Sequence, residues 1–231
     1  MDADGFTLCA STADLSREPA AREHADAVEF RMDLAAEPSR AIESYDGDLP
    51  LVVTNRASWE GGEAEDLARY EALTDAIAHE AVVAVDVELA ALRGNAPAGE
   101  RSHAVALRDT AREEGVDVIA SVHDFEVTPE VDVMVDLLAD AASEGDVAKL
   151  ATAAETRGDA LAMVTATHRA TEAGHPVATM CMGEAGRHTR AVTPLYGSRI
   201  GYAPVDPAEA TAPGQYDLAT LRGLLTDLGV T

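Results

Sequence analysis

The stretch DVIASVHDFEVTPEVDVMVDLLADAASEGDVAKLATA (117–153) decides the fold class. Two short valine-rich runs, 117–125 and 146–153, enclose a segment with helical periodicity. Both runs are apolar on both faces, as strands inside a parallel sheet are. The segment between them opens with Thr128 and Pro129, which predicts a threonine cap followed by proline at the first helical position. The stretch therefore predicts one strand–helix–strand unit.

The same alternation runs along the whole chain. We expect eight strands, at 6–12, 27–34, 50–57, 82–89, 117–125, 146–153, 176–183 and 200–205, with helical segments between them. Eight such units in 231 residues predict a single (β/α)8 TIM barrel, forming one catalytic domain over residues 1–231. An open, doubly wound sheet is the alternative. It is the weaker one, because no GxGxxG or GxxxxGK[ST] motif follows a strand.

The composition restricts the partners. Lys and Arg together number 17 and Asp and Glu 42, which gives a net charge of −25. This charge repels nucleic acid and anionic membranes, so we expect neither as a partner. It is typical of proteins that work in molar salt, where a Debye length of about 3 Å screens self-repulsion. Bias in codon usage towards arginine is the alternative explanation for the scarcity of lysine.

We expect neither a targeting signal nor a membrane segment in this chain. Its first residues are acidic, and no apolar run approaches the roughly 20 residues that cross a bilayer. Cys9 and Cys181 lack the CxxC spacing of a zinc or redox site, so we expect free buried thiols. These features predict a cytoplasmic protein.

Charged residues alternate within the expected strands, where a barrel interior is normally apolar. They are Glu29, Arg31, Asp33, Arg56, Asp86, Glu88, His123 and Lys149, with Ser121 in phase with His123. Each has a structural explanation: a satisfied core histidine, an Arg31–Asp33 ion pair, or carboxylates that fill a polar interior. Unpaired buried charges are costly, however. Several of them converging on one barrel end predict a network, and hence a functional site.

Lys149 is the single lysine of the chain, beside sixteen arginines. Arginine replaces lysine in most salt bridges, but it stays protonated and cannot act as a nucleophilic amine. A lysine amine in a desolvated site can condense with a carbonyl to form a Schiff base. We therefore expect Lys149 to be a nucleophile. His123, on the neighbouring strand, is the expected proton carrier.

The motifs EFRMDL, TNRASWEGG, VDVEL, SVHDF, VAKLA, MCMGEAGRHTR, YGS and TAPGQ follow one another over nearly the whole chain. In this order they closely resemble the type I 3-dehydroquinate dehydratase family. The resemblance implies a (β/α)8 barrel and a hydro-lyase of the shikimate pathway of aromatic amino acid biosynthesis. Such an enzyme dehydrates 3-dehydroquinate to 3-dehydroshikimate through a lysine Schiff base. It uses no metal and no organic cofactor.

The resemblance also implies residue roles. Lys149 would form the imine, His123 would be the general acid and base, and Glu60 would orient that histidine. The implied substrate-binding residues are Glu29, Phe30, Arg31, Arg56, Arg190, Thr211 and Gln215, with Met180 and Met182 in the pocket wall. Among them Arg190 would bind the substrate carboxylate. The implied partner is the small-molecule substrate, and a homodimer is the oligomer that the sequence leaves open.

Three departures from the family pattern stand out. Thr211 replaces a usual serine, Asn55 a common aromatic, and Trp59 a smaller or charged residue. The first strand also begins so early that we expect no hairpin closing the barrel bottom. Other readings stay open. They are a class I aldolase-like barrel, an inactive barrel that acts as a binding protein, and a metal-dependent barrel using Asp86, Glu88 and His123.

Overall fold

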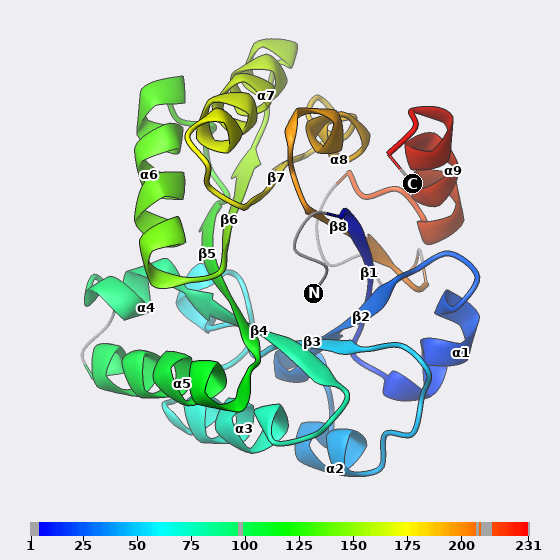
Figure 1. Ribbon diagram of the computed structural model, residues 1–231, viewed down its shortest axis with the longest axis vertical. Helices are drawn as coiled ribbons and strands as arrows, with labels where there is room; N and C mark the ends of the chain where they lie inside the picture. The colour runs from blue at the N-terminus through cyan, green and yellow to red at the C-terminus, as the bar shows by residue number, and fades with distance from the viewer. Residues whose placement is uncertain (1–4, 97–98, 207, 209–213, 231) are drawn as a thin grey trace.

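The computed structural model describes residues 5–96, 99–206, 208 and 214–230. Eight parallel strands form its centre: β1 Thr7–Thr12, β2 Ala27–Arg31, β3 Leu51–Thr54, β4 Val82–Glu88, β5 Asp117–Asp124, β6 Val147–Ala153, β7 Val177–Met182 and β8 Ile200–Pro204. Their order is β7-β6-β5-β4-β3-β2-β1-β8, and β1 pairs in parallel with both β2 and β8. The strands thus curl into a ring (Figure 1).

The ring closes between β7 and β8 by few contacts. Arg199 N–H donates to Val177 O at 2.7 Å, and Thr179 N–H donates to the Ser198 hydroxyl at 2.9 Å. Every other neighbouring pair of strands forms a parallel ladder, with one register shift in the β3–β4 pair between Leu51 and Val52. The predicted (β/α)8 barrel is therefore confirmed. The doubly wound alternative is wrong, because the strands follow one another around the ring in chain order and the two ends of the sheet meet.

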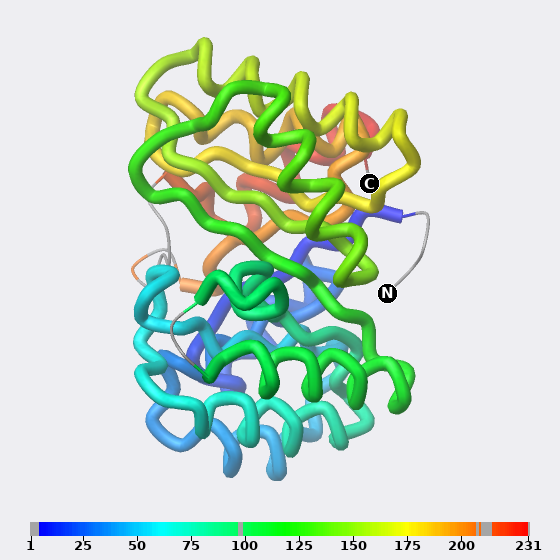
Figure 2. Tube along the Cα trace, turned by 90° about the vertical axis from the view of Figure 1, so that its left-hand side faces the viewer, coloured from blue at the N-terminus to red at the C-terminus, as the bar shows by residue number. Residues whose placement is uncertain are grey.

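Helices surround the strands on the outside. They are α1 Glu18–Ala21, α2 Pro38–Glu43, α3 Ala68–Ile77, α4 Leu89–Arg93, α5 Glu100–Glu114, α6 Val131–Glu144, α7 Arg157–Glu172, α8 Thr189–Val192 and α9 Leu218–Asp227. Figure 2 shows α3 and α5 running side by side along one flank of the barrel. Among the described helices, none is long and apolar enough to cross a bilayer. The fold thus places every strand between the barrel interior and a helical layer (Figure 1).

Alternation along the strands produces two apolar layers. Side chains such as Ala27, Ile119 and Ala178 fill the barrel interior. Those at the intervening positions, including Val28 and Phe30, pack against the helices. Because alanine occupies several of these interior positions, room remains for charged side chains near the carboxyl ends of the strands.

Local signals set only some of the helix ends. α5 is followed by its cap residue Gly115, whose φ of +74° is the left-handed conformation that glycine adopts without strain. The expected cap at Thr128 is wrong, because α6 begins only at Val131. The Thr128 hydroxyl instead donates to Ala153 O at 2.6 Å. This tertiary contact with the end of β6 replaces the local one.

Candidate active site

A cavity opens at the carboxyl ends of the strands. It is lined by Glu29, Arg31, Thr54, Arg56, Glu60, Gly61, His123, Phe125, Lys149, Ala151, Met180, Met182, Arg190, Tyr202 and Gln215. These residues come from six of the eight strands and from the segments that follow strands. Their convergence follows from strand alternation, since the inward positions of parallel strands meet at one end of the barrel.

Lys149 lies on the inner face of β6, beside Ser121 of β5 and Ala178 of β7. Its side chain is only 6% exposed. Nζ donates to Asp86 Oδ2 at 2.9 Å and lies 3.7 Å from Glu29 Oε1. It also lies 4.3 Å from the centroid of the Tyr202 ring. Lys149 is therefore a buried amine held between two carboxylates and an aromatic face, at the wall of the cavity.

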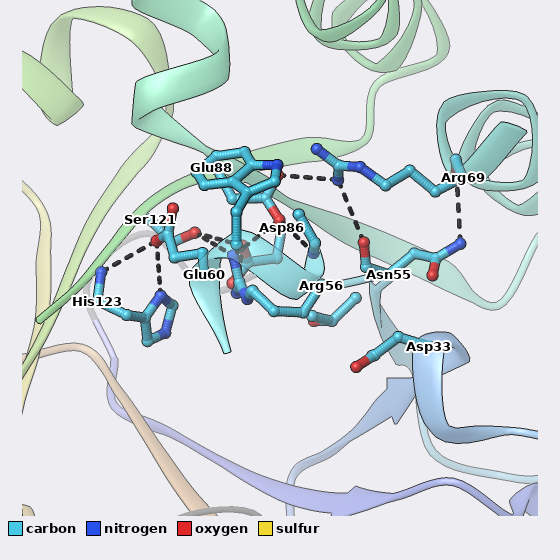
Figure 3. A network of polar contacts seen from close by, with 12 residues as sticks. Asp33, Asn55, Arg56, Glu60, Arg69, Asp86, Glu88, Ser121 and His123 are labelled. Atoms are coloured by element: carbon cyan, nitrogen blue, oxygen red, sulfur yellow. Dashed lines mark hydrogen bonds and ion pairs between the residues drawn. The ribbon is translucent and has the colours of Figure 1, made fainter. Parts of the chain in front are cut away.

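Asp86 connects Lys149 to Arg56. Arg56 Nη2 lies 2.7 Å from Asp86 Oδ1, and the Ser121 hydroxyl donates to the same oxygen at 2.6 Å. Burial acts to raise the pKa of Asp86, but Arg56 and Lys149 outweigh it and hold that pKa below its usual value. Asp86 therefore stays ionised and fixes both cations. Figure 3 shows Arg56, Asp86 and Ser121 gathered beside His123.

His123 and Glu60 form a pair across the cavity mouth. Glu60 Oε1 lies 2.9 Å from His123 Nδ1 and accepts the backbone N–H of His123 at 3.0 Å (Figure 3). An oxygen that already accepts one N–H is best matched by a proton on Nδ1, which leaves Nε2 with a free lone pair. Burial, and after it Arg56 and Lys149, hold the pKa of His123 well below its usual value. The imidazole is therefore neutral and basic at Nε2.

Burial raises the pKa of Glu60 to about 8, although Arg56 opposes that shift. Burial is the largest cause of both pKa shifts, since desolvation disfavours the charged form of Glu60 and of His123. The pair therefore carries little net charge before a ligand enters. A proton that reaches Nε2 creates an imidazolium beside a carboxyl oxygen, which is the arrangement of a general base with an orienting partner.

Arg190 is a buried cation without a carboxylate partner among the described residues. It is 4% exposed, its Nη1 lies 3.5 Å from Met180 Sδ, and its Nε has no hydrogen-bond partner. Burial lowers its pKa to about 10, so it remains charged at neutral pH. A buried, unpaired guanidinium is costly. It is well suited to an anionic ligand that reaches the cavity.

The structure brings most of the predicted site residues together. Lys149, His123, Glu60, Glu29, Arg31, Arg56, Arg190, Gln215, Met180 and Met182 all line the cavity. Phe30 does not, because it follows Glu29 on β2, points to the opposite face and packs under the helices. Thr211 lies outside the described residues. Arg31 is held by Asp33, with Nε–Oδ1 and Nη2–Oδ2 distances of 2.9 and 2.6 Å.

Sequence reasoning did not single out Phe125 and Tyr202 as cavity residues. The Phe125 ring stacks on His123 with centroids 6.1 Å apart and an interplanar angle of 16°. A Cβ on Gly61 would lie 2.4 Å from this ring. Tyr202 lies inward on β8, opposite Cys9 of β1. The alternation of β8 contained the signal for Tyr202, whereas the place of Phe125 depends on a turn after β5.

The arrangement is unsuited to a metal centre. Among the described residues, no three His, Cys, Asp or Glu side chains are grouped to hold a metal ion. Glu88 and Asp86 are each held by arginine: Glu88 Oε2 accepts from Arg69 Nη1 at 2.9 Å, and Asp86 accepts from Arg56. Carboxylates already engaged by cations are poor ligands, which disfavours the metal-dependent barrel.

The chain is similar over nearly its whole length to known proteins. The family model described as type I 3-dehydroquinase matches residues 9–231. Proteins named 3-dehydroquinate dehydratase from the haloarchaea Haloarcula marismortui and Halobacterium salinarum are 57% and 52% identical to the chain. Each alignment covers 99% of this chain, with 98% and 100% of the respective relative.

A solved structure agrees with these relatives. The crystal structure of 3-dehydroquinate dehydratase from Geobacillus kaustophilus has a TM-score of 0.82 and 26% identity. The alignment covers 97% of this chain and 91% of that one. With the barrel, the cavity and the ordered motifs, these likenesses lead to one conclusion: the chain belongs to the type I 3-dehydroquinase family.

Proposed function

We propose that this chain is a 3-dehydroquinate dehydratase that converts 3-dehydroquinate to 3-dehydroshikimate through a Schiff base on Lys149. In this role residues 1–231 act as one catalytic domain of the shikimate pathway. The observation that carries the proposal is the placement of the single lysine. It is buried at the cavity wall, between the carboxylates of Asp86 and Glu29, in a cavity that also holds the His123–Glu60 pair.

Binding comes first in the proposed mechanism. Arg190, a buried guanidinium without a carboxylate partner among the described residues, binds the carboxylate of the substrate. Glu29 and Arg31 reach the ring hydroxyls from β2, while Met180 and Met182 pack against the apolar edge of the ring. The anionic group thus fixes the ring with its ketone towards Lys149.

The amine of Lys149 then attacks the C3 ketone. Its proton passes to a base in the site, water leaves, and a C3=N imine forms. The positively charged imine withdraws electrons from C2. His123 Nε2 removes a proton from C2, and the C–H electron pair forms an enamine. Glu60 supports the resulting imidazolium through Nδ1.

The enamine next expels the C1 hydroxyl. His123 returns its proton to that oxygen, so the group leaves as water and a C1=C2 double bond forms. Addition of water to the imine releases 3-dehydroshikimate and regenerates the amine. In sum, one water molecule leaves the substrate and no oxidant or reductant is consumed. Asp86 and Arg56 stay ionised throughout, and their ion pair keeps Lys149 in place while the proton moves.

Borohydride trapping tests this proposal. Wild-type protein incubated with 3-dehydroquinate and borohydride should gain the mass of one reduced adduct, and peptide mapping should place it on Lys149. Lys149→Ala and Lys149→Arg should form no adduct and show no turnover, because a guanidinium does not condense with ketones. An adduct in either variant would place the nucleophile elsewhere.

His123→Ala should fail differently. It should still form an adduct, slowly, but turn over about 10²- to 10⁴-fold less, because general acid–base catalysis is lost while the amine remains. Appearance of the conjugated enone product, followed by its absorbance, measures that turnover. Full activity of His123→Ala would remove the proposed proton carrier. An inactive wild-type chain would overturn the function, and a class I aldolase-like or binding role would have to be tested instead.

A further inference from the structure

A second buried polar cluster lies behind the cavity, between α3, α5 and the end of β4. We call it the Arg69 cluster; it comprises Arg69, Tyr70, Glu88, Glu100, Asn55 and Trp59. Arg69 lies at its centre, in the first turn of α3, and is 4% exposed. Figure 3 shows the Arg69 guanidinium reaching Glu88 and Asn55. None of the six residues lines the cavity, so the proposed chemistry leaves this cluster unexplained.

Arg69 makes contacts on both ends of its guanidinium. Nη1 donates to Glu88 Oε2 at 2.9 Å and to Asn55 O at 3.2 Å. Nη2 donates to Glu100 Oε2 at 2.7 Å and to the Tyr70 hydroxyl at 2.6 Å. The Trp59 indole N–H also reaches Glu100, with Nε1–Oε1 at 3.4 Å. One arginine therefore ties together β4, α5 and the segment that follows β3.

The segment after β3 carries Arg56 and Glu60, two residues of the proposed site. Asn55 and Ala57 flank Arg56, and the turn Ser58–Glu60 follows directly. The cluster holds both flanks, because Arg69 binds the Asn55 carbonyl and Glu88 Oε1 accepts the Ala57 N–H at 3.0 Å. Trp59, the neighbour of Glu60, is held through Glu100. The backbone on either side of Arg56 and the residue before Glu60 are thus fixed from behind the cavity.

Arg69 also affects which of two carboxylates, Asp86 or Glu88, binds Arg56. Arg56 Nη2 binds Asp86 at 2.7 Å, and its Nη1 lies 3.4 Å from Glu88 Oε1. With Arg69 present, Glu88 has a full cationic partner of its own. Without it, Glu88 would be a buried carboxylate with Arg56 as its nearest cation, and such a charge is strongly driven to find a partner. Arg56 would be drawn towards Glu88 and away from Asp86.

We propose that Arg69 is a positioning residue of the active site, which holds the 55–60 segment so that Glu60 meets His123 and Arg56 meets Asp86. This inference rests on the proposed function. The competing explanation is that the cluster only stabilises the fold. The two differ in what remains when Arg69 is changed: a merely structural role lowers the amount of folded protein, and a positioning role lowers the rate of each folded site.

The experiment therefore counts sites and rates separately. Borohydride trapping with 3-dehydroquinate, read by intact mass, gives the number of imine-forming sites, and steady-state kinetics gives kcat and KM. Arg69→Gln should retain trappable sites but show a kcat per site about 10- to 100-fold lower, as displacement of catalytic groups by about 1 Å does. KM should change less than kcat, because Arg190 and Arg31, which bind the substrate in the proposed mechanism, lie outside the Arg69 cluster.

Two further variants sharpen the comparison. Arg69→Lys should fall between wild type and Arg69→Gln, because an ammonium keeps the charge but cannot bond Glu88, Glu100 and the Asn55 carbonyl together. Arg222→Gln is the matched control. Arg222 pairs with Asp26 and the His24 carbonyl, before β2 at the amino end of the barrel, so kcat per site should stay at the wild-type value.

Equal kcat per trapped site in wild type and both Arg69 variants would overturn the positioning role. If neither Arg69 variant folds, Glu100→Gln decides: its side-chain oxygen can still accept from Trp59 and Tyr70, but the charge that holds Arg69 Nη2 is gone. A lowered kcat per site then supports the inference, and an unchanged one overturns it. A wild-type chain that neither traps an adduct nor dehydrates the substrate would fail the proposed function itself, which is a distinguishable result.

Discussion

The buried charge of Arg190 lowers the stability of the fold but provides a binding group for an anionic ligand. Its guanidinium is buried, and within the described part of the chain no carboxylate balances it. Arg187, three residues earlier, differs: it is 36% exposed, lies 3.7 Å from Glu184 and stacks on the Tyr216 ring. The two arginines share a segment but not an environment. We therefore expect Arg190, and not Arg187, to bind the anionic group of the substrate.

Arg190→Met should therefore change binding and stability in opposite directions. Loss of the charge-assisted contact to a carboxylate should cost about 2–5 kcal/mol of binding, seen as a large rise in KM for 3-dehydroquinate. The substrate-free variant should be more stable, by roughly 1 kcal/mol or more, because a buried unpaired charge is removed. Steady-state kinetics and urea unfolding measure the two effects. Arg187→Met is the control, and a larger KM effect there would transfer the carboxylate to Arg187.

Single residues also show how far sequence reasoning reaches. Lys149 and His123 could be predicted because a reactive residue type stood at an inward position of a strand, where alternation fixes its direction. Arg69 and Glu100 could not, because each lies in a helix rich in charged residues and resembles a solvent-exposed position. Their burial depends on how α3 and α5 pack together, which no local pattern contains.

At the scale of elements, the turn after β3 contributes Arg56, Glu60 and Gly61 to the lining of the cavity. It folds back on itself: Gly62 N–H donates to Ala57 O at 3.0 Å, and Ala64 N–H donates to Arg56 O at 3.1 Å. A Cβ placed on Gly62 would lie 2.1 Å from the Arg56 carbonyl oxygen. Because that atom belongs to the backbone, the turn itself would have to move.

Gly62→Ala should therefore displace the turn that ends in Glu60 and lower kcat by up to about 100-fold. Gly223→Ala is the matched control, since a Cβ there meets no atom within 4 Å in helix α9. It should leave kcat unchanged and stabilise the protein by about 0.5–1 kcal/mol, as alanine does in a helix interior. Kinetics and thermal unfolding of both variants provide the check. Wild-type turnover in Gly62→Ala would show that the turn is dispensable.

Element existence was easier to predict than element length. Each expected strand is present, but 27–34 and 50–57 shorten to Ala27–Arg31 and Leu51–Thr54. In both cases polar residues continued the alternation past the point where pairing stops. After β2 the chain turns through the 3-10 helix Met32–Leu34, and Asp33 bonds back to Arg31 across that turn. Alternating polar residues therefore do not mark where a strand ends, because residues of the candidate site continue the pattern beyond the last paired residue.

At the scale of the whole molecule, the net charge of −25 governs behaviour in solution. Lowering the salt from 1 M to 0.01 M lengthens the Debye screening distance from about 3 Å to about 30 Å. Repulsion among the acidic side chains then spans most of the molecule. Relatives from haloarchaea share the chain's overall sequence, which agrees with a surface adapted to concentrated salt.

The free energy of unfolding and the dehydration rate should therefore both rise with potassium chloride concentration. Urea unfolding at fixed salt and the product assay follow the two quantities over the same series. Sucrose at matched osmolarity is the control, because it favours compact states without screening charge. A response to sucrose equal to that of the salt would contradict an electrostatic cause, and a flat salt response would contradict the halophilic interpretation.

The closure between β7 and β8 has a mechanical consequence. A barrel with complete ladders between all neighbouring strands is a closed sheet. This one is a curled sheet whose two edge strands meet through contacts of Val177, Thr179, Ser198 and Arg199. Such a sheet can change its circumference by slippage where its edge strands meet, with every internal ladder intact. Met180 lies on one edge strand and Tyr202 on the other, and both face the cavity. The width of the cavity therefore depends on the join between β7 and β8, which fewer hydrogen bonds hold than any other pair of neighbouring strands.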